Sequence, residues 1–273
     1  MAGVLTNPER YLPDFWPTYF KSAKGCKIRD YDNNNYIDLS LMGVGTNVLG
    51  YANSQIDNAV KKNISKSNMS TLNCKEEIIL AEKLIELHPW ADMTRFARAG
   101  GEANAIAIRI ARAATNKDNV AFCGYHGWHD WYLSSNLNTK NNLDFHLLPG
   151  LETKGIPKFL RNSVFPFKYG EKINFKNFFK KNKIGVVITE LSRQKKINIK
   201  FLKKLLSAAK KSGVIVIFDE CTSGFREYFG GIHLKYKLKP DLVTYGKAIG
   251  NGYPITAILG SAKIMKNAST TFI

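Results

Sequence analysis

The sequence has little cysteine and no long apolar run. Its 273 residues include four cysteines (Cys26, Cys74, Cys123 and Cys221) and no Cys-x-x-Cys pair. This excludes a zinc ribbon or a disulfide framework and is typical of a reducing compartment. No stretch of about 18 uncharged apolar residues occurs, so we expect no membrane span. The first ten residues lack the basic start and apolar core of a secretory signal, so we predict a cytoplasmic protein.

Acidic residues are also scarce. The chain has 22 Asp and Glu against 40 Lys and Arg, which gives a formal net charge of +18. Such an excess raises the question of a nucleic-acid partner. Much of it is lysine spread along helices and loops between Lys168 and Lys211, with no interleaved pattern of aromatic residues suited to base stacking. We therefore attribute the charge to composition and expect no nucleic-acid surface.

The first 70 residues are expected to form a separate part. Residues 1–25 contain Pro8, Pro13 and Pro17, which favour an irregular arm. Alternating residues flank an Asn/Asp cluster between Gly25 and Leu39, which predicts a β-hairpin. A helix is predicted at 54–65 and a second one at 75–88, in the larger part that we place at residues 71–273.

From Asp92 onward, apolar strands alternate with helices. Strands that are apolar on both faces and separated by helices predict an α/β fold with a mostly parallel sheet. A last apolar run, 255–259, is expected to pair antiparallel. The predicted strands are 93–98, 119–123, 184–189, 214–219 and 242–246, with helices at 102–114 and 199–212.

A lysine follows the last of the parallel strands. Lys247 ends the largely apolar run 241–246, and Gly250 and Gly252 follow it closely. A buried amine at a strand end is a nucleophile suited to forming a Schiff base with a carbonyl. The alternative is a lysine that extends from the strand end into water.

Two further motifs follow predicted strands. Gly100 and Gly101 stand between a strand and a helix, where backbone N–H groups favour an anion, although many such turns bind nothing. Tyr125 and His126 follow the strand 119–123, where open α/β sheets bind ligands. Tyr125 is a candidate to stack on a flat cofactor or an ordinary core aromatic. His126 and His129 have no third ligand of suitable spacing, so we expect no metal site.

Carboxylates end two neighbouring strands. Asp219 and Glu220 follow four apolar residues, and Glu190 ends the run 186–189. A carboxylate there needs a cation, a metal or water. Asp219 and Glu220 are candidates for binding magnesium, or one of them for holding a protonated ring nitrogen. A Schiff-base lysine, an acid, a flat aromatic and a phosphate cradle together are what pyridoxal phosphate requires.

These residues resemble the class III, fold type I pyridoxal-phosphate aminotransferases, in particular those similar to glutamate-1-semialdehyde 2,1-aminomutase. The resemblance covers nearly the whole chain and rests on the order and spacing of its motifs. They are the 32–38 hairpin, Arg95-Phe-Ala-Arg-Ala-Gly-Gly-Glu-Ala103, Tyr125-His-Gly127, Phe218-Asp-Glu220, Gly224-Phe-Arg226 and Gly246-Lys247.

The resemblance implies roles for individual residues. Lys247 would hold the cofactor as a Schiff base and shuttle the proton, and Asp219 would keep the pyridine nitrogen protonated. Tyr125 and Cys221 would cover the two ring faces, with His126 beside Tyr125. The backbone of Gly100 and Gly101 would bind the phosphate, and Glu190 would lie near the cofactor hydroxyl.

The chain departs from the family pattern at its phosphate-binding turn, after Glu190, where the family has proline and this chain has Leu191, and at its C-terminal end. The phosphate-binding turn reads Ala99-Gly100-Gly101 instead of the usual Ser-Gly-Thr, so it lacks two hydroxyl donors. Relatives also continue past the equivalent lysine into a small C-terminal domain, so we expect this chain to be an N-terminal fragment that holds an incomplete cofactor domain.

The implied function is amino-group transfer between an amino donor and an aldehyde or keto acceptor, by an aminotransferase or aminomutase acting as a homodimer. Two alternatives stay open at this point. The same cofactor serves decarboxylases and racemases, and a fragment can keep the fold without turnover.

Overall fold

The computed structural model describes residues 19–39, 42–66, 70–146, 150–192, 196–271 and 273. The chain divides into two compact units. One comprises residues 1–74 with 250–253, and the other comprises 75–249 with 254–273. The division into two domains near residue 70 stays a prediction.

The first unit contains a small antiparallel sheet of three described strands, β1 (Phe20–Lys24), β2 (Lys27–Asp30) and β3 (Asn35–Ile37). The predicted hairpin is β2–β3, in which Lys27 pairs with Ile37. Its turn is held by buried Asp30, whose carboxylate accepts hydrogen bonds from Asn34 N (2.8 Å) and Tyr36 Oη (2.9 Å).

In this unit one strand lies where the sequence predicted no regular structure, and one helix lies where it was predicted. Strand β1 occupies residues that we expected to be irregular, because the prolines that suggested an arm all lie before residue 18, outside the described residues. The predicted helix at 54–65 is α3 (Ser54–Ile64), which begins after Asn53, whose side chain accepts from the amides of Gln55 and Ile56. A left-handed turn, labelled α2 (Met42–Gly45), precedes it, with φ of 71° at Gly43 and 58° at Val44.

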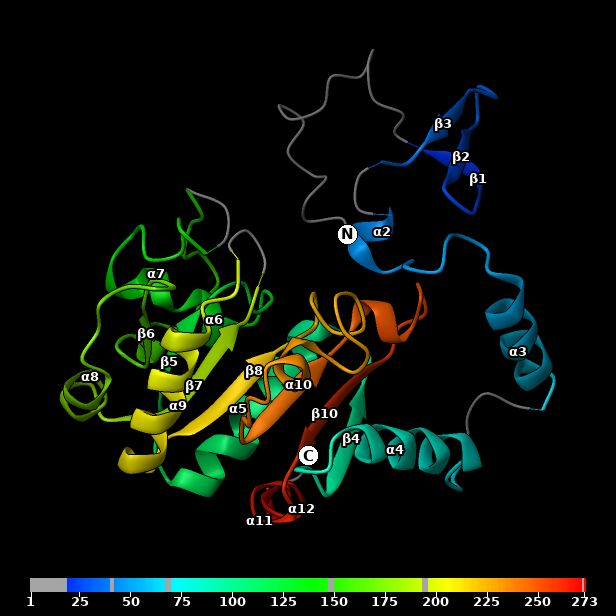
Figure 1. Ribbon diagram of the computed structural model, residues 1–273. Coiled ribbons are helices and arrows are strands. Elements are labelled where there is room, and N and C mark those ends of the chain that lie inside the picture. The colour runs from blue at the N-terminus through cyan, green and yellow to red at the C-terminus, as the bar shows by residue number, and fades with distance from the viewer. Residues whose placement is uncertain (1–18, 40–41, 67–69, 147–149, 193–195, 272) are drawn as a thin grey trace. The chain divides into compact units, whose positions relative to one another are not determined.

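Seven described strands form the sheet of the second unit, in the order β4-β10-β9-β8-β7-β5-β6. Strands β5 to β9 are mutually parallel, and β10 runs antiparallel to both β9 and β4. The expected fold class and the antiparallel last strand are therefore confirmed (Figure 1). The strands are β4 (Met93–Ala97), β5 (Asn119–Cys123), β6 (Val164–Pro166), β7 (Ile184–Glu190), β8 (Ile215–Asp219), β9 (Leu242–Tyr245) and β10 (Thr256–Gly260).

Helices cover both faces of this sheet, which explains why strands such as β7 and β8 are buried along their whole length. In β7, Val186 and Ile188 belong to the same buried cluster as the alanines and isoleucines of α5 (Gly100–Thr115). Val187, between them, belongs to a second cluster with side chains of α4 (Lys75–Leu87), α8 (Phe175–Lys181) and α9 (Ile199–Ser212).

Shorter helical turns complete the unit: α6 (Asp130–Leu133), α7 (Ser135–Asn138), η2 (Lys158–Leu160), α10 (Ile232–Lys235), η3 (Lys247–Ile249), α11 (Ala262–Met265) and α12 (Asn267–Thr270). The longer elements agree with the sequence predictions to within two residues, whereas β6 and α8 were not predicted. None of the helices in the described ranges is long and apolar enough to cross a bilayer.

Candidate functional site

The carboxyl ends of four strands meet at one edge of the large sheet. The register pairs Cys123 of β5 with Thr189 of β7, Glu190 with Asp219 of β8, and Asp219 with Thr244 of β9. The residues that follow these positions are therefore brought to the same edge. Open α/β sheets bind their ligands there.

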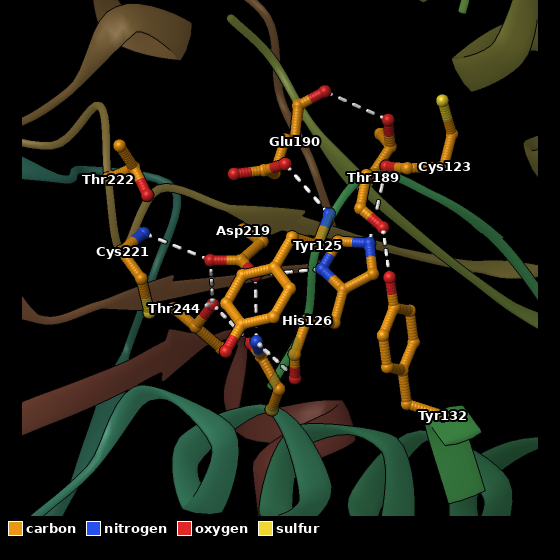
Figure 2. Close-up of polar contacts among 12 residues, drawn as sticks. Cys123, Tyr125, His126, Tyr132, Thr189, Glu190, Asp219, Cys221, Thr222 and Thr244 are labelled. Carbon is orange, nitrogen blue, oxygen red and sulfur yellow. Dashed lines mark hydrogen bonds and ion pairs between the residues drawn. The ribbon is translucent and has the colours of Figure 1, made fainter. Parts of the chain in front are cut away.

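Asp219 is a buried acid with several hydrogen-bond partners at this edge (Figure 2). Its side chain is 3% exposed. Oδ2 accepts from Asn104 Nδ2 at 2.7 Å and lies 2.8 Å from His126 Nδ1, and Oδ1 accepts from the Cys221 amide at 3.0 Å. Burial alone would raise the pKa of Asp219, but these hydrogen bonds and the His126 charge outweigh it and hold the pKa below its usual value. The carboxylate is therefore ionised at neutral pH.

His126 is fully enclosed behind this carboxylate. It is 1% exposed, and its ring stacks on Trp131 with centroids 6.3 Å apart and an interplanar angle of 25°. Nε2 lies 3.2 Å from the carbonyl oxygen of Cys123 while Nδ1 faces Asp219. Both ring nitrogens face acceptors, so the ring fixes Asp219 in place rather than opening toward a ligand.

Tyr125 and Glu190 are linked through the backbone. The Tyr125 amide donates to Glu190 Oε2 at 2.8 Å, and the half-buried Tyr125 ring meets Tyr132 edge-on at 6.2 Å. Gly124 permits this approach: with φ at 115°, a Cβ there would lie 2.7 Å from Glu190 Oε2. The Tyr125 backbone, which follows β5, and the Glu190 carboxylate, at the end of β7, are thus brought together.

The Cys221 thiol fills a narrow space between two backbone segments. A Cβ built on Gly100 would lie 3.3 Å from its Sγ, and one on Gly246 would lie 3.4 Å away. Burial, and then the negative charge of Asp219, raise the pKa of this thiol well above its usual value. Cys221 therefore behaves as a small, uncharged, nearly apolar side chain.

Lys247 begins the turn that follows β9. Its backbone has φ of 48°, in the left-handed region that a non-glycine residue adopts only at a cost. The half-buried side chain donates from Nζ to Thr222 Oγ1 at 2.9 Å. The amine is thus directed toward the segment that follows β8 instead of extending into water.

Gly100 and Gly101 form the first turn of α5, two residues earlier than predicted. Its N-cap is Ala99, whose side chain has no acceptor atom. Glu102 Oε2 accepts instead from the amides of Arg98 (2.8 Å) and Ala99 (3.4 Å). The amide ends of a helix of this length favour an anion.

Sequence reasoning missed two members of the site. Asn104 of α5 donates to Asp219 and accepts from Thr244 Oγ1 at 2.8 Å. The available signal was a polar residue inside an apolar pattern: Asn104 stands in an alanine-rich helix and Thr244 in an apolar strand, and both are at most 2% exposed.

Glu220 does not join Asp219. Successive strand residues point to opposite faces, and Glu220 accepts from Ser223, from the Ile232 and His233 amides and from His233 Nδ1. Within the described residues no group of three potential metal ligands occurs.

A family profile described as aminotransferase class-III matches residues 13–272. The chain belongs to the class-III aminotransferase family. This class-III chain is 33% identical over 276 residues to 3-aminobutyryl-CoA aminotransferase of Cloacimonas acidaminovorans and 35% identical over 277 residues to glutamate-1-semialdehyde 2,1-aminomutase of Methanococcus maripaludis. These alignments cover 97% and 98% of the chain but only 62% and 63% of the relatives, so the chain spans less than two thirds of their length.

The class-III fold is also found in solved structures. The FumI protein of Sphingopyxis sp. MTA144, determined with PLP, superposes with a TM-score of 0.84 at 27% identity, over 97% of this chain and 62% of that one. The sequence-based assignment to this family is confirmed.

Proposed function

We propose that this chain is the cofactor-binding part of a pyridoxal-phosphate-dependent aminotransferase or aminomutase. The observation that carries the proposal is an ionised, buried Asp219 at the sheet edge from which Lys247 also extends. Family membership supports the same reading. The substrates would be a small amino donor and an aldehyde or keto acceptor.

The hydrogen bonds around Asp219 suit a ligand with a cationic ring N–H. Oδ2 already has two partners, Asn104 and His126. Oδ1 has the Cys221 amide, and the Thr244 hydroxyl lies 3.4 Å from it but 2.8 Å from Asn104 Oδ1. A hydroxyl has one hydrogen, and the shorter contact takes it. Oδ1 therefore retains a lone pair for one more donor.

When bound, pyridoxal phosphate supplies an electrophilic aldehyde and an electron-withdrawing ring. Lys247 would attach the cofactor covalently and then carry a proton to and from the substrate carbon. Asp219 would hold the proton on the ring nitrogen, and His126 would act through Asp219 by fixing its orientation.

The remaining residues would position the cofactor. Tyr125 and Cys221 would pack against opposite faces of the ring, and Glu190 would lie on its hydroxyl side. The free amides of Gly100 and Gly101 would bind the phosphate. No side chain in these contacts selects between aminotransferase and aminomutase chemistry.

We further propose a homodimer in a reducing compartment such as the cytoplasm. Large apolar side chains of the first unit are exposed, among them Leu39 (91%) and Leu72 (81%), and a second copy would cover them. The four cysteines are free thiols.

Covalent trapping tests the proposal. The chain is mixed with pyridoxal phosphate, reduced with borohydride and digested, and the modified peptide is identified by mass spectrometry. We expect one modified lysine, Lys247, and loss of the visible absorbance in Lys247→Ala. Modification that persists in Lys247→Ala, or that spreads over surface lysines, would contradict the assignment. Lys263→Ala, an exposed lysine of α11, is the matched control and should label like the wild type.

A further inference from the structure

The first turn of α5 offers an anion only backbone donors. Ala99, Gly100 and Gly101 have no polar side-chain atom. The amides of Gly100, Gly101 and Glu102 have no acceptor within the described residues. A phosphate at this helix end would therefore lack a side-chain ligand from the turn itself.

A histidine from another loop lies against this turn. A Cβ built on Gly101 would be 3.0 Å from His129 Cδ2 and 3.4 Å from His129 Nε2. The imidazole edge thus occupies the space that a side chain at position 101 would fill. Neither ring nitrogen of His129 has a hydrogen-bond partner in the part of the chain that the structure describes.

The surroundings of His129 hold its ring in this position. Trp128 stacks on it with centroids 4.7 Å apart and an interplanar angle of 15°. The His129 carbonyl oxygen accepts from the amides of Tyr132 (2.9 Å) and Leu133 (3.2 Å), so the His129 backbone is fixed at the start of α6. Gly127 brings the loop to α5, because a Cβ there would lie 2.7 Å from Gly101 Cα.

We propose that His129 is a phosphate-binding residue that supplies the side-chain donor missing from the Ala99-Gly100-Gly101 turn. The inference rests on the proposed function, and the ligand is the phosphate group of pyridoxal phosphate. A ring N–H of His129 would donate to a phosphate oxygen while the amides of α5 bind the others. The same contact explains why position 101 is glycine: a larger residue would collide with His129.

The experiment compares two cofactor forms that differ only in the phosphate. Affinities for pyridoxal phosphate and for pyridoxal are measured by absorbance titration of the 273-residue chain, without substrate. A lost hydrogen bond to a charged group corresponds to roughly a 10- to 100-fold change in affinity. We expect His129→Ala to weaken the binding of pyridoxal phosphate by about that factor and to leave the affinity for pyridoxal unchanged. Unchanged pyridoxal binding also shows that the variant is folded.

A second variant tests whether the side chains at positions 101 and 129 compete for the same space. Gly101 has no positive φ, and a Cβ there would meet the His129 ring at 3.0 Å and lie in ordinary contact with Gly127 Cα at 3.5 Å, so the ring is the tight neighbour of a threonine. Gly101→Thr alone should lower the affinity for pyridoxal phosphate. Gly101→Thr in the His129→Ala background should restore much of the affinity that His129→Ala loses, because the threonine hydroxyl enters the space that the imidazole leaves. Failure of this rescue would argue against the shared site.

The outcomes separate this inference from the proposed function. If the wild type fails to attach pyridoxal phosphate at Lys247, the proposed function is wrong. If the wild type binds and His129→Ala weakens both cofactor forms equally, or neither, His129 is not a phosphate ligand.

Discussion

Glu220→Gln should destabilise the fold strongly although Glu220 lies outside the candidate site. The side chain is completely buried. Oε1 accepts from the His233 amide (2.9 Å) and from His233 Nδ1 (2.7 Å). Oε2 accepts from Ser223 Oγ (2.8 Å) and from the Ile232 amide (2.9 Å). The carboxylate thus holds the loop after β8 and the start of α10 together.

The magnitude follows from the number of bonds lost. Glutamine keeps one acceptor oxygen, so in either orientation its NH₂ faces one backbone amide, that of Ile232 or that of His233, to which it cannot bond. The other group that it faces, Ser223 Oγ or His233 Nδ1, can accept from it instead. A hydrogen bond to a charged group contributes about 1.5–3 kcal/mol, so losing one should lower the free energy of unfolding by roughly that amount. The removal of a buried negative charge moderates this loss, because its desolvation cost disappears as well.

Urea unfolding at neutral pH, followed by circular dichroism, measures the effect. The unfolding midpoint should fall while the slope stays the same. Glu227→Gln is the matched control: Glu227 is 44% exposed and pairs with Lys235 at 2.7 Å, and a surface ion pair contributes little. Equal midpoints for Glu220→Gln and Glu227→Gln would refute the reasoning.

Two further predictions concern the loop that approaches α5. Gly127→Ala should lower the free energy of unfolding by about 1–3 kcal/mol more than Gly213→Ala does. Both glycines have positive φ, but only a Cβ at position 127 would meet backbone, at 2.7 Å from Gly101 Cα. Equal unfolding midpoints of the two variants in urea would contradict the close approach. Burial, then the charges of His126 and Lys168, lower the pKa of His146 to about 4, and its Nδ1 accepts from the Gly124 amide at 3.1 Å. Protonation of His146 therefore favours the unfolded state. The free energy of unfolding that the neutral ring contributes is fully present above pH 6.5 and is lost as the pH falls toward 4. After allowance for solvent screening, the wild type should lose about 1 kcal/mol more than His146→Gln between pH 7 and pH 5; parallel stability curves would show that His146 is not responsible.

The elements that the sequence predicted best are those that both faces of the sheet bury. Strand β5 and helix α9 have the predicted bounds, because an unbroken apolar run or a strong helical period needs no tertiary information. Strand β6 and helix α8 were missed for opposite reasons. β6 has only three residues, and α8 is a seven-residue helix rich in phenylalanine and lysine that is stabilised by packing on α9.

Some residues of the candidate site could be predicted from the sequence, and others only from the structure. Lys247, Asp219 and Glu190 were identified because charged residues at the ends of apolar strands are unusual. Asn104 and His129 were not assigned to the site, since their contacts join segments far apart in the chain. Glu220 was considered together with Asp219 for magnesium, and only the strand's alternation, with His233 on the other side, separates the two carboxylates.

The sequence by itself therefore determined the order of strands and helices and the chemical types at one sheet edge, because periodicity and strand-end charges are local properties. The tertiary structure decided which hydrogen bonds those groups make. Asp219 stays ionised because an asparagine and a histidine from two other segments converge on it together with the nearby Cys221 amide, and the glycine turn of α5 meets His129 because Gly127 lets two backbones come close. Such contacts depend on distances between segments that no local pattern encodes.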